Sequence, residues 1–165
     1  MKDRACQKHT PSCRSRRVLG VLFAAYLAGL CYLLFFEKAL GRTDVHRGYS
    51  YNLVLLREIR RFVRYREQLG LWPIMVNLVG NVCCFIPFGM FLYLEFPRLR
   101  YVAAITAVTC LFSLLIETTQ LVFRVGCFDV DDILLNTLGG FLGAVGMVCY
   151  NYLGMKGKIH GEMGD

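Results

Sequence analysis

Residues 101–123, YVAAITAVTCLFSLLIETTQLVF, contain a single charged side chain, that of Glu117. As an α-helix this segment would be about 35 Å long, enough to cross the roughly 30 Å hydrocarbon core of a bilayer. A charge at the helix centre costs about 2.5–3.5 kcal/mol on insertion scales, whereas the eleven Leu, Ile, Val and Phe residues together contribute about −3 to −7 kcal/mol. The sequence therefore predicts a transmembrane helix whose Glu117 faces protein or water rather than lipid.

Three other apolar segments have a similar length, at residues 18–36, 74–94 and 133–153. Hydrophobic residues make up 56% of the chain, against about 45–50% in a soluble domain. Because the excess falls in blocks long enough to span a membrane, the sequence predicts an all-α, polytopic membrane protein with about four transmembrane helices. The predicted organisation is a basic N-terminal tail (1–17), a membrane domain (18–153) and a polar C-terminal tail (154–165).

The long loop at residues 37–73 is predicted to contain an amphipathic helix. Its apolar residues recur at helical spacing, and most of its arginines lie elsewhere on the helical wheel, which is typical of a helix in the headgroup region. The apolar positions are Leu55, Ile59, Phe62, Val63 and Leu69. The alternative is a surface helix that packs on other loops. Asn52 is expected to cap the helix.

The net charge of +7 does not indicate nucleic-acid binding, because the basic residues lie outside the apolar blocks and accompany no nucleic-acid-binding motif. Basic residues that flank transmembrane segments normally meet anionic lipid headgroups. Five of the eight cysteines lie inside apolar blocks, so the chain is not a disulfide framework. No cofactor and no metal site are predicted.

The third span carries a polar face. Ser113, Glu117, Gln120 and Arg124 step by four, three and four residues, so they share one side of a helix. The spacing allows Gln120 to bridge Glu117 and Arg124 by hydrogen bonds. A functional site and a structural seam between helices both fit this pattern.

Polar residues also open the fourth span, in the segment 124–136, RVGCFDVDDILLN. Asp129 and Asp132 are spaced as an N-cap residue and its partner in an acidic capping box, a purely structural interpretation. Asp132 and Asn136 share a helical face, and a divalent cation bound by their oxygens is the functional alternative. On the second span, Asn77 and Asn81 are also four residues apart, as expected for amides that hydrogen-bond to another helix.

These polar residues should gather at one membrane face. Asn77 and Asn81 lie early in the second span, Glu117 and Gln120 late in the third, and Asp129 just before the fourth. Since consecutive spans alternate in direction, these ends meet on the side of the 37–73 loop. The simplest geometry is a one-sided polar pocket covered by that loop.

The orientation of the chain follows from its basic N-terminal tail. The side of the membrane that holds the N-terminus carries ten Lys and Arg residues and the other side carries nine, so the totals are nearly equal. However, the basic tail directly precedes the first span, and the charge at this position often decides orientation. We therefore expect both termini in the cytoplasm and the polar pocket outside.

Three linked motifs resemble the VanZ-like family of bacterial membrane proteins. They are YNLVLLREIRRF (51–62), NLVGNVCCFIPFGMFL (77–92) and SLLIETTQLVFRVGCFDVDDILLNTLGG (113–140). The resemblance implies a membrane domain of four to five helices and an association with resistance to teicoplanin, a lipoglycopeptide. The polar positions that it implies as ligand-binding are Asn77, Asn81, Glu117, Gln120, Arg124, Asp129, Asp132 and Asn136.

Several functions fit these observations. The first is binding at the outer leaflet of the bacterial cell membrane, of a lipid headgroup, a lipid-linked wall precursor or the lipophilic antibiotic. The second is a membrane-embedded enzyme that modifies a lipid or wall precursor, with Glu117 as acid or base, Arg124 holding a phosphate and Asp132 assisting. A small transporter and a structural membrane partner are the others. The Gly-rich fourth span is a candidate interface for a homo-oligomer.

Overall fold

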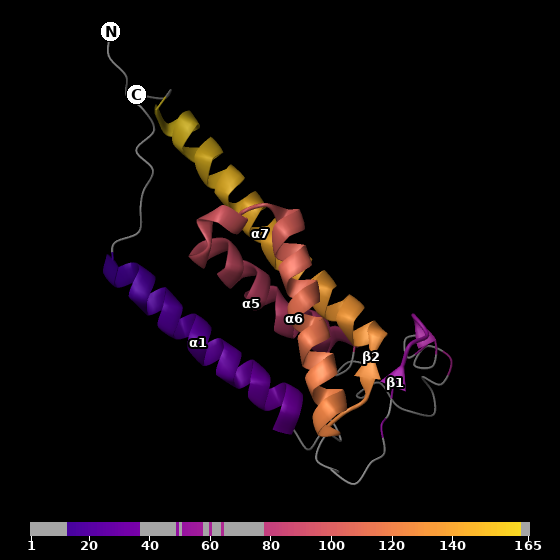
Figure 1. The fold of residues 1–165 in the computed structure, drawn as a ribbon. Coiled ribbons are helices and arrows are strands. Elements are labelled where there is room, and N and C mark those ends of the chain that lie inside the picture. The colour runs from indigo at the N-terminus through magenta and orange to yellow at the C-terminus, as the bar shows by residue number, and fades with distance from the viewer. Residues whose placement is uncertain are drawn as a thin grey trace.

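The computed structural model describes residues 13–36, 49, 51–57, 60, 64 and 78–162. The described chain is all-α, apart from two short strands, which confirms the predicted fold class. Its helices are α1 (Cys13–Phe36), α5 (Gly80–Glu95), the short 3-10 helix η3 (Pro97–Leu99), α6 (Val102–Phe123) and α7 (Val130–Glu162). In Figure 1, α1 and α6 run from the upper to the lower end of the bundle, and α5 and α7 run back.

Three of the described helices are long and apolar enough to cross a membrane: Arg14–Phe35, Val102–Phe123 and Val130–Gly154. The fourth, α5, has 16 residues, and the first part of the span expected at 74–94 lies outside the described residues. The outward face of α6 presents Leu111, Leu115 and Val122, each more than 60% exposed. Large apolar side chains on an unpartnered helix face are typical of contact with lipid.

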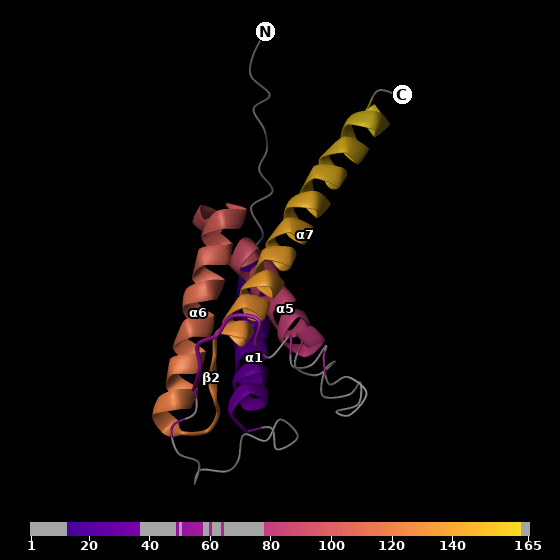
Figure 2. The same cartoon turned by 90° about the vertical axis from the view of Figure 1, so that its right-hand side faces the viewer.

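The ends of two helices differ from the predicted spans. The first helix begins at Cys13 rather than at residue 18, because arginine is a good helix former and can continue a helix in the headgroup layer. The last helix has 33 residues, about 50 Å, which exceeds the thickness of the hydrocarbon core. Its C-terminal part extends beyond the other helices (Figure 2).

The centre of the bundle is the packing of α5 against α7, which glycines bring close together. A Cβ atom added at Gly139 or Gly143 would overlap the carbonyl oxygens of Val82 and Ile86 on α5. On the other side, a Cβ at Gly140 would overlap Thr109 of α6. The glycines of the fourth span therefore let α7 pack on α5 at backbone distance and leave room for the side chain of Thr109 on α6.

The hydrophobic core continues from this contact toward α1. Phe85 is fully buried, and Phe88 stacks on Phe112 of α6 with the ring centroids 4.7 Å apart. The aromatic contacts extend to Phe23 of α1, whose ring lies 5.2 Å from that of Phe91. Aromatic packing thus joins the first helix to the glycine-packed helices.

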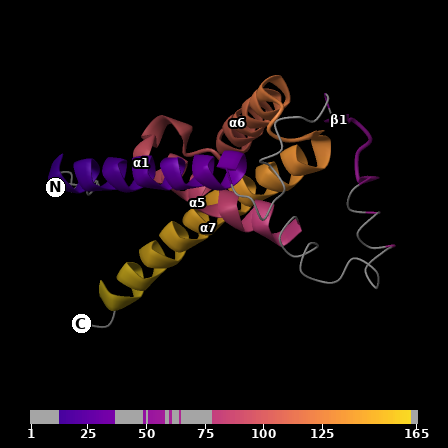
Figure 3. The ribbon, with the colours of Figure 1, turned by 90° about the horizontal axis from the view of Figure 1, so that it is seen from below.

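The two strands are a feature that the sequence did not predict. β1 (Tyr51–Asn52) pairs in parallel with β2 (Phe128–Asp129), with Asn52 opposite Asp129. Figure 3 shows β1 near the ends of α6 and α7, seen from below. Most of the amphipathic helix expected at 37–73 lies outside the described residues. Of its apolar positions the structure describes only Leu55, which is exposed.

Candidate functional site: a buried polar cluster at one end of the bundle

Glu117 lies near the lower end of α6 and joins this helix to the start of α7. Its side chain is 2% exposed, and its Oε2 accepts a hydrogen bond from the backbone N–H of Asp129 at 3.0 Å. Asp129 in turn caps α7, since its Oδ1 accepts the N–H of Asp131 at 2.8 Å. In a capping box the N–H of Asp129 would be donated to Asp132 of the same helix. Here a carboxylate of a neighbouring helix accepts it.

Asp132 and Asn136 connect α7 to two other helices. Asn81 of α5 donates from Nδ2 to Oδ1 of Asp132 at 2.6 Å, and Asn136 donates from Nδ2 to Oγ of Ser113 on α6 at 2.9 Å. Asn136 and Ser113 are almost completely buried. Asn77, which the sequence also places at this end of the bundle, lies outside the described residues.

Gln120 extends the cluster to the first helix. It is 1% exposed, and its Nε2 donates to the carbonyl oxygen of Leu34 in α1 at 2.9 Å. The spacing in the sequence allows this amide to bridge Glu117 and Arg124. The structure uses it to bind the end of α1, which no sequence pattern indicated.

Arg124 lies at the surface rather than in the cluster. It ends α6 in the left-handed conformation, with φ 56°, and its side chain is exposed. Its guanidinium carbon lies 4.4 Å from the ring centroid of Tyr49, within the range of a cation–π contact.

The segment around β1 is fastened to the cluster by side chains. Asn52 is 5% exposed and donates from Nδ2 to Oδ1 of Asp129 at 3.2 Å, while its own Oδ1 accepts the N–H of Val54. The N–H of Leu56 is donated to Oδ1 of Asp131. The sequence predicts only a helix-capping role for Asn52 and no role for Asp131. The available signal was Asp131 itself, an acidic residue in the first turn of a membrane helix that the capping pattern of Asp129 and Asp132 does not explain.

The polar cluster is rich in acidic side chains, and these are buried. Three buried carboxylates, those of Glu117, Asp129 and Asp131, lie at the junction of α6, α7 and β1. They accept hydrogen bonds from backbone and amide donors, which offsets part of the cost of burying charge. Within the described part of the chain, no group of His, Cys, Asp and Glu has the arrangement of a metal site. The arrangement can hold the 51–57 segment over the helix ends.

We expect Ser113→Ala to destabilise the fold by about 1–3 kcal/mol, because the buried Nδ2 of Asn136 would lose its acceptor. The double variant Ser113→Ala/Asn136→Leu should recover part of this loss, since it removes both polar partners and keeps the volume. Unfolding in detergent, followed by circular dichroism, measures both. Equal stability of the double and single variants would contradict the hydrogen bond.

Comparisons with known proteins agree on one family. The chain is similar to the family described as VanZ/LLP1 over residues 23–151. It is also 31% identical over 127 residues to a protein of Enterococcus faecium, Protein VanZ, a match that covers 74% of this chain and 68% of that protein. No solved structure matches.

Proposed function

Because the chain belongs to the VanZ/LLP1 family, we propose that it protects a bacterial cell envelope against teicoplanin-type lipoglycopeptides. It does so by binding an anionic, lipid-linked molecule at the end of the bundle that carries the polar cluster. The bound molecule is the antibiotic, a wall precursor or a lipid headgroup, which share an anionic group and a lipid chain.

The observation that carries this proposal is the exposed rim of the cluster. Arg124 presents its guanidinium next to the ring of Tyr49, and Tyr51 is 64% exposed on β1. A guanidinium is suited to phosphate and carboxylate, and tyrosines are suited to the membrane interface. We call Tyr49, Tyr51 and Arg124 the rim surface.

The buried cluster supports binding rather than catalysis in this proposal. Glu117 is 2% exposed and already accepts the N–H of Asp129, so a substrate would reach it only after the residues around it move. In the binding function, Glu117 instead positions the start of α7, and Asp129 positions β1 with its neighbouring tyrosines.

The proposed orientation places the rim surface at the outer leaflet and both termini in the cytoplasm. The strong basic bias of residues 1–17 supports it. A reporter fused after residue 45 should therefore be active only if it functions outside the cytoplasm. Activity of a reporter that works only in the cytoplasm would reverse the orientation and place the rim surface at the inner leaflet.

The function is tested by the inhibitory concentration of teicoplanin in a sensitive bacterial host. The host expresses wild type, Glu117→Gln, Arg124→Gln or no protein, at matched membrane levels. We expect wild type to raise the inhibitory concentration several-fold and Arg124→Gln to lose most of that protection, whereas Glu117→Gln should keep most of it, because Glu117 acts through its hydrogen bond to Asp129. Thr118→Val, at the exposed position next to Glu117, is the matched control and should protect fully.

The results for the two variants distinguish a structural role of Glu117 from a role that needs its charge. A glutamine retains an oxygen that can accept the N–H of Asp129, so a purely structural role predicts that Glu117→Gln still protects. If only Arg124→Gln loses protection, the rim surface binds without the charge of Glu117. If wild type gives no protection, the proposed function is wrong.

A further inference from the structure

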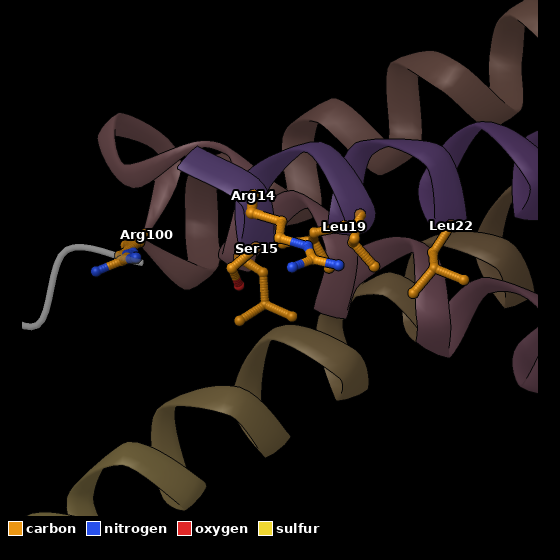
Figure 4. A pocket seen from close by; sticks show the side chains of 7 residues that line it. Arg14, Ser15, Leu19, Leu22 and Arg100 are labelled. Atoms are coloured by element: carbon orange, nitrogen blue, oxygen red, sulfur yellow. The ribbon is translucent and has the colours of Figure 1, made fainter. Parts of the chain in front are cut away.

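A cavity of about 710 Å³ lies at the opposite end of the bundle from the polar cluster. It forms where α1 begins, where α5 ends and where the chain enters α6. Its lining consists of Arg14, Ser15, Val18, Leu19, Leu22, Leu94 and Arg100. Figure 4 shows these residues and labels Arg14, Ser15, Leu19, Leu22 and Arg100; the labelled α1 side chains follow one another along the helix, and Arg100 lies beside its start.

The polar and apolar residues of the cavity are layered by depth. Arg14 and Ser15 lie in the first turn of α1, and Arg100 lies two residues before α6 begins. Val18 and Leu22 follow Arg14 by one and two helical turns, about 6 and 12 Å deeper along the axis. The cavity therefore has a cationic rim at headgroup level and apolar walls at the level of the acyl chains.

The two guanidinium groups have no carboxylate within ion-pair distance among the residues that the structure describes. Arg100 is held in place by its neighbour Tyr93. Its Nε donates to the carbonyl oxygen of Tyr93 at 3.3 Å, and its guanidinium carbon lies 5.5 Å from the ring centroid. These contacts use Nε and one face of the group, so the terminal nitrogens remain able to bind an anion.

The apolar walls are open to the bilayer. Val18 and Leu22 are each 54% exposed, and Leu94 is 38% exposed. A soluble anion would contact only the arginines, whereas a phospholipid entering from the bilayer would also cover these walls.

We propose that this cavity binds an anionic glycerophospholipid. Its phosphodiester lies between Arg14 and Arg100, and one acyl chain lies along Val18, Leu22 and Leu94. The site anchors the start of α1 to the end of α5 at the membrane surface opposite the rim surface. It does not depend on the proposed function, because it shares no residue with the polar cluster.

The experiment compares lipid retention by the full-length protein, purified in detergent and supplied with phosphatidylglycerol or phosphatidylcholine. Native mass spectrometry counts the bound lipids. Wild type should retain phosphatidylglycerol at least tenfold more tightly than phosphatidylcholine. Arg14→Gln/Arg100→Gln should lose this preference. Arg16→Gln/Arg98→Gln, which removes the same charge from exposed positions that do not line the cavity, should keep it.

A second variant tests the walls without changing the charge. Leu22→Trp should fill the lower part of the cavity and reduce phosphatidylglycerol retention, even if the double arginine variant fails to fold. Glycerol phosphate at the same concentration should neither compete with the lipid nor raise the unfolding temperature. Retention by Arg14→Gln/Arg100→Gln at the wild-type level, or competition by glycerol phosphate, would overturn the proposal.

Discussion

Gly143→Leu is expected to disrupt the bundle, whereas Gly146→Leu on the same helix should leave it intact. A Cβ atom at Gly143 would overlap the carbonyl oxygen of Ile86 in α5, and the backbone cannot move aside without separating α5 from α7. Overpacking in a well-packed core costs about 1–3 kcal/mol and occasionally more, and a clash with backbone belongs at the upper end. At Gly146 nothing lies within 4 Å of an added Cβ, so the change should stay within about 0.5 kcal/mol.

The measurement is the fraction of protein that remains folded and monodisperse in detergent on heating. Gly139→Leu should behave like Gly143→Leu, because its Cβ would meet the carbonyl oxygen of Val82. Equal tolerance of leucine at positions 143 and 146 would contradict the packing of α7 on α5. The same variants address the predicted homo-oligomer: if Gly146→Leu dissociates an oligomer without unfolding the monomer, this part of α7 is its interface.

The second large effect is expected from Asn52→Asp, which should release β1 from the helix ends. The amide nitrogen of Asn52 lies 3.2 Å from Oδ1 of Asp129, and both side chains are buried. Two unit charges about 3 Å apart repel by about 5 kcal/mol at an effective dielectric constant of 20. The variant must therefore protonate one carboxylate or move the segment away.

Exchanging the two residues should restore the contact. In Asn52→Asp/Asp129→Asn, the amide at position 129 can donate to the carboxylate at position 52, and asparagine remains a good N-cap for α7. Hydrogen–deuterium exchange at the amides of Val54 and Leu56 reports on the segment, since both donate to side chains of this junction. We expect exchange more than tenfold faster in the single variant and near the wild-type rate in the exchanged pair.

This pair of variants also bears on function. If β1 positions the rim surface, Asn52→Asp should lower teicoplanin protection and the exchanged pair should recover it. If β1 is released and protection does not change, the rim surface acts without the strand pair, and the role proposed for the cluster is wrong.

Much of the architecture could be predicted from the sequence, because the bilayer imposes simple requirements. A segment such as 101–123 must be helical to satisfy its backbone in hydrocarbon, and its length must match the membrane. Alternation of direction then brings the start of α5, the end of α6 and the start of α7 to one side. Asn81, Glu117 and Asp132 accordingly lie at the same end of the bundle.

The partners of these side chains could not be predicted, because they depend on how the helices rotate and pack. Helical spacing placed Gln120 on the face of Glu117, but only the approach of α1 brought Leu34 within its reach. The capping pattern paired Asp129 with Asp132, which are close in sequence. The structure gives the N–H of Asp129 to Glu117, which is twelve residues away.

The sequence by itself thus determined that the chain is all-α, with helices long and apolar enough to cross a membrane, and at which end of the bundle its polar groups gather. These properties depend on composition and length along single segments. The tertiary structure alone decided that Gly139 and Gly143 face α5, that Asn52 reaches Asp129, and that Arg14 and Arg100 share a cavity. Each of these contacts joins segments that are distant in sequence. They form only when close packing of the helices has set the rotation and depth of each one.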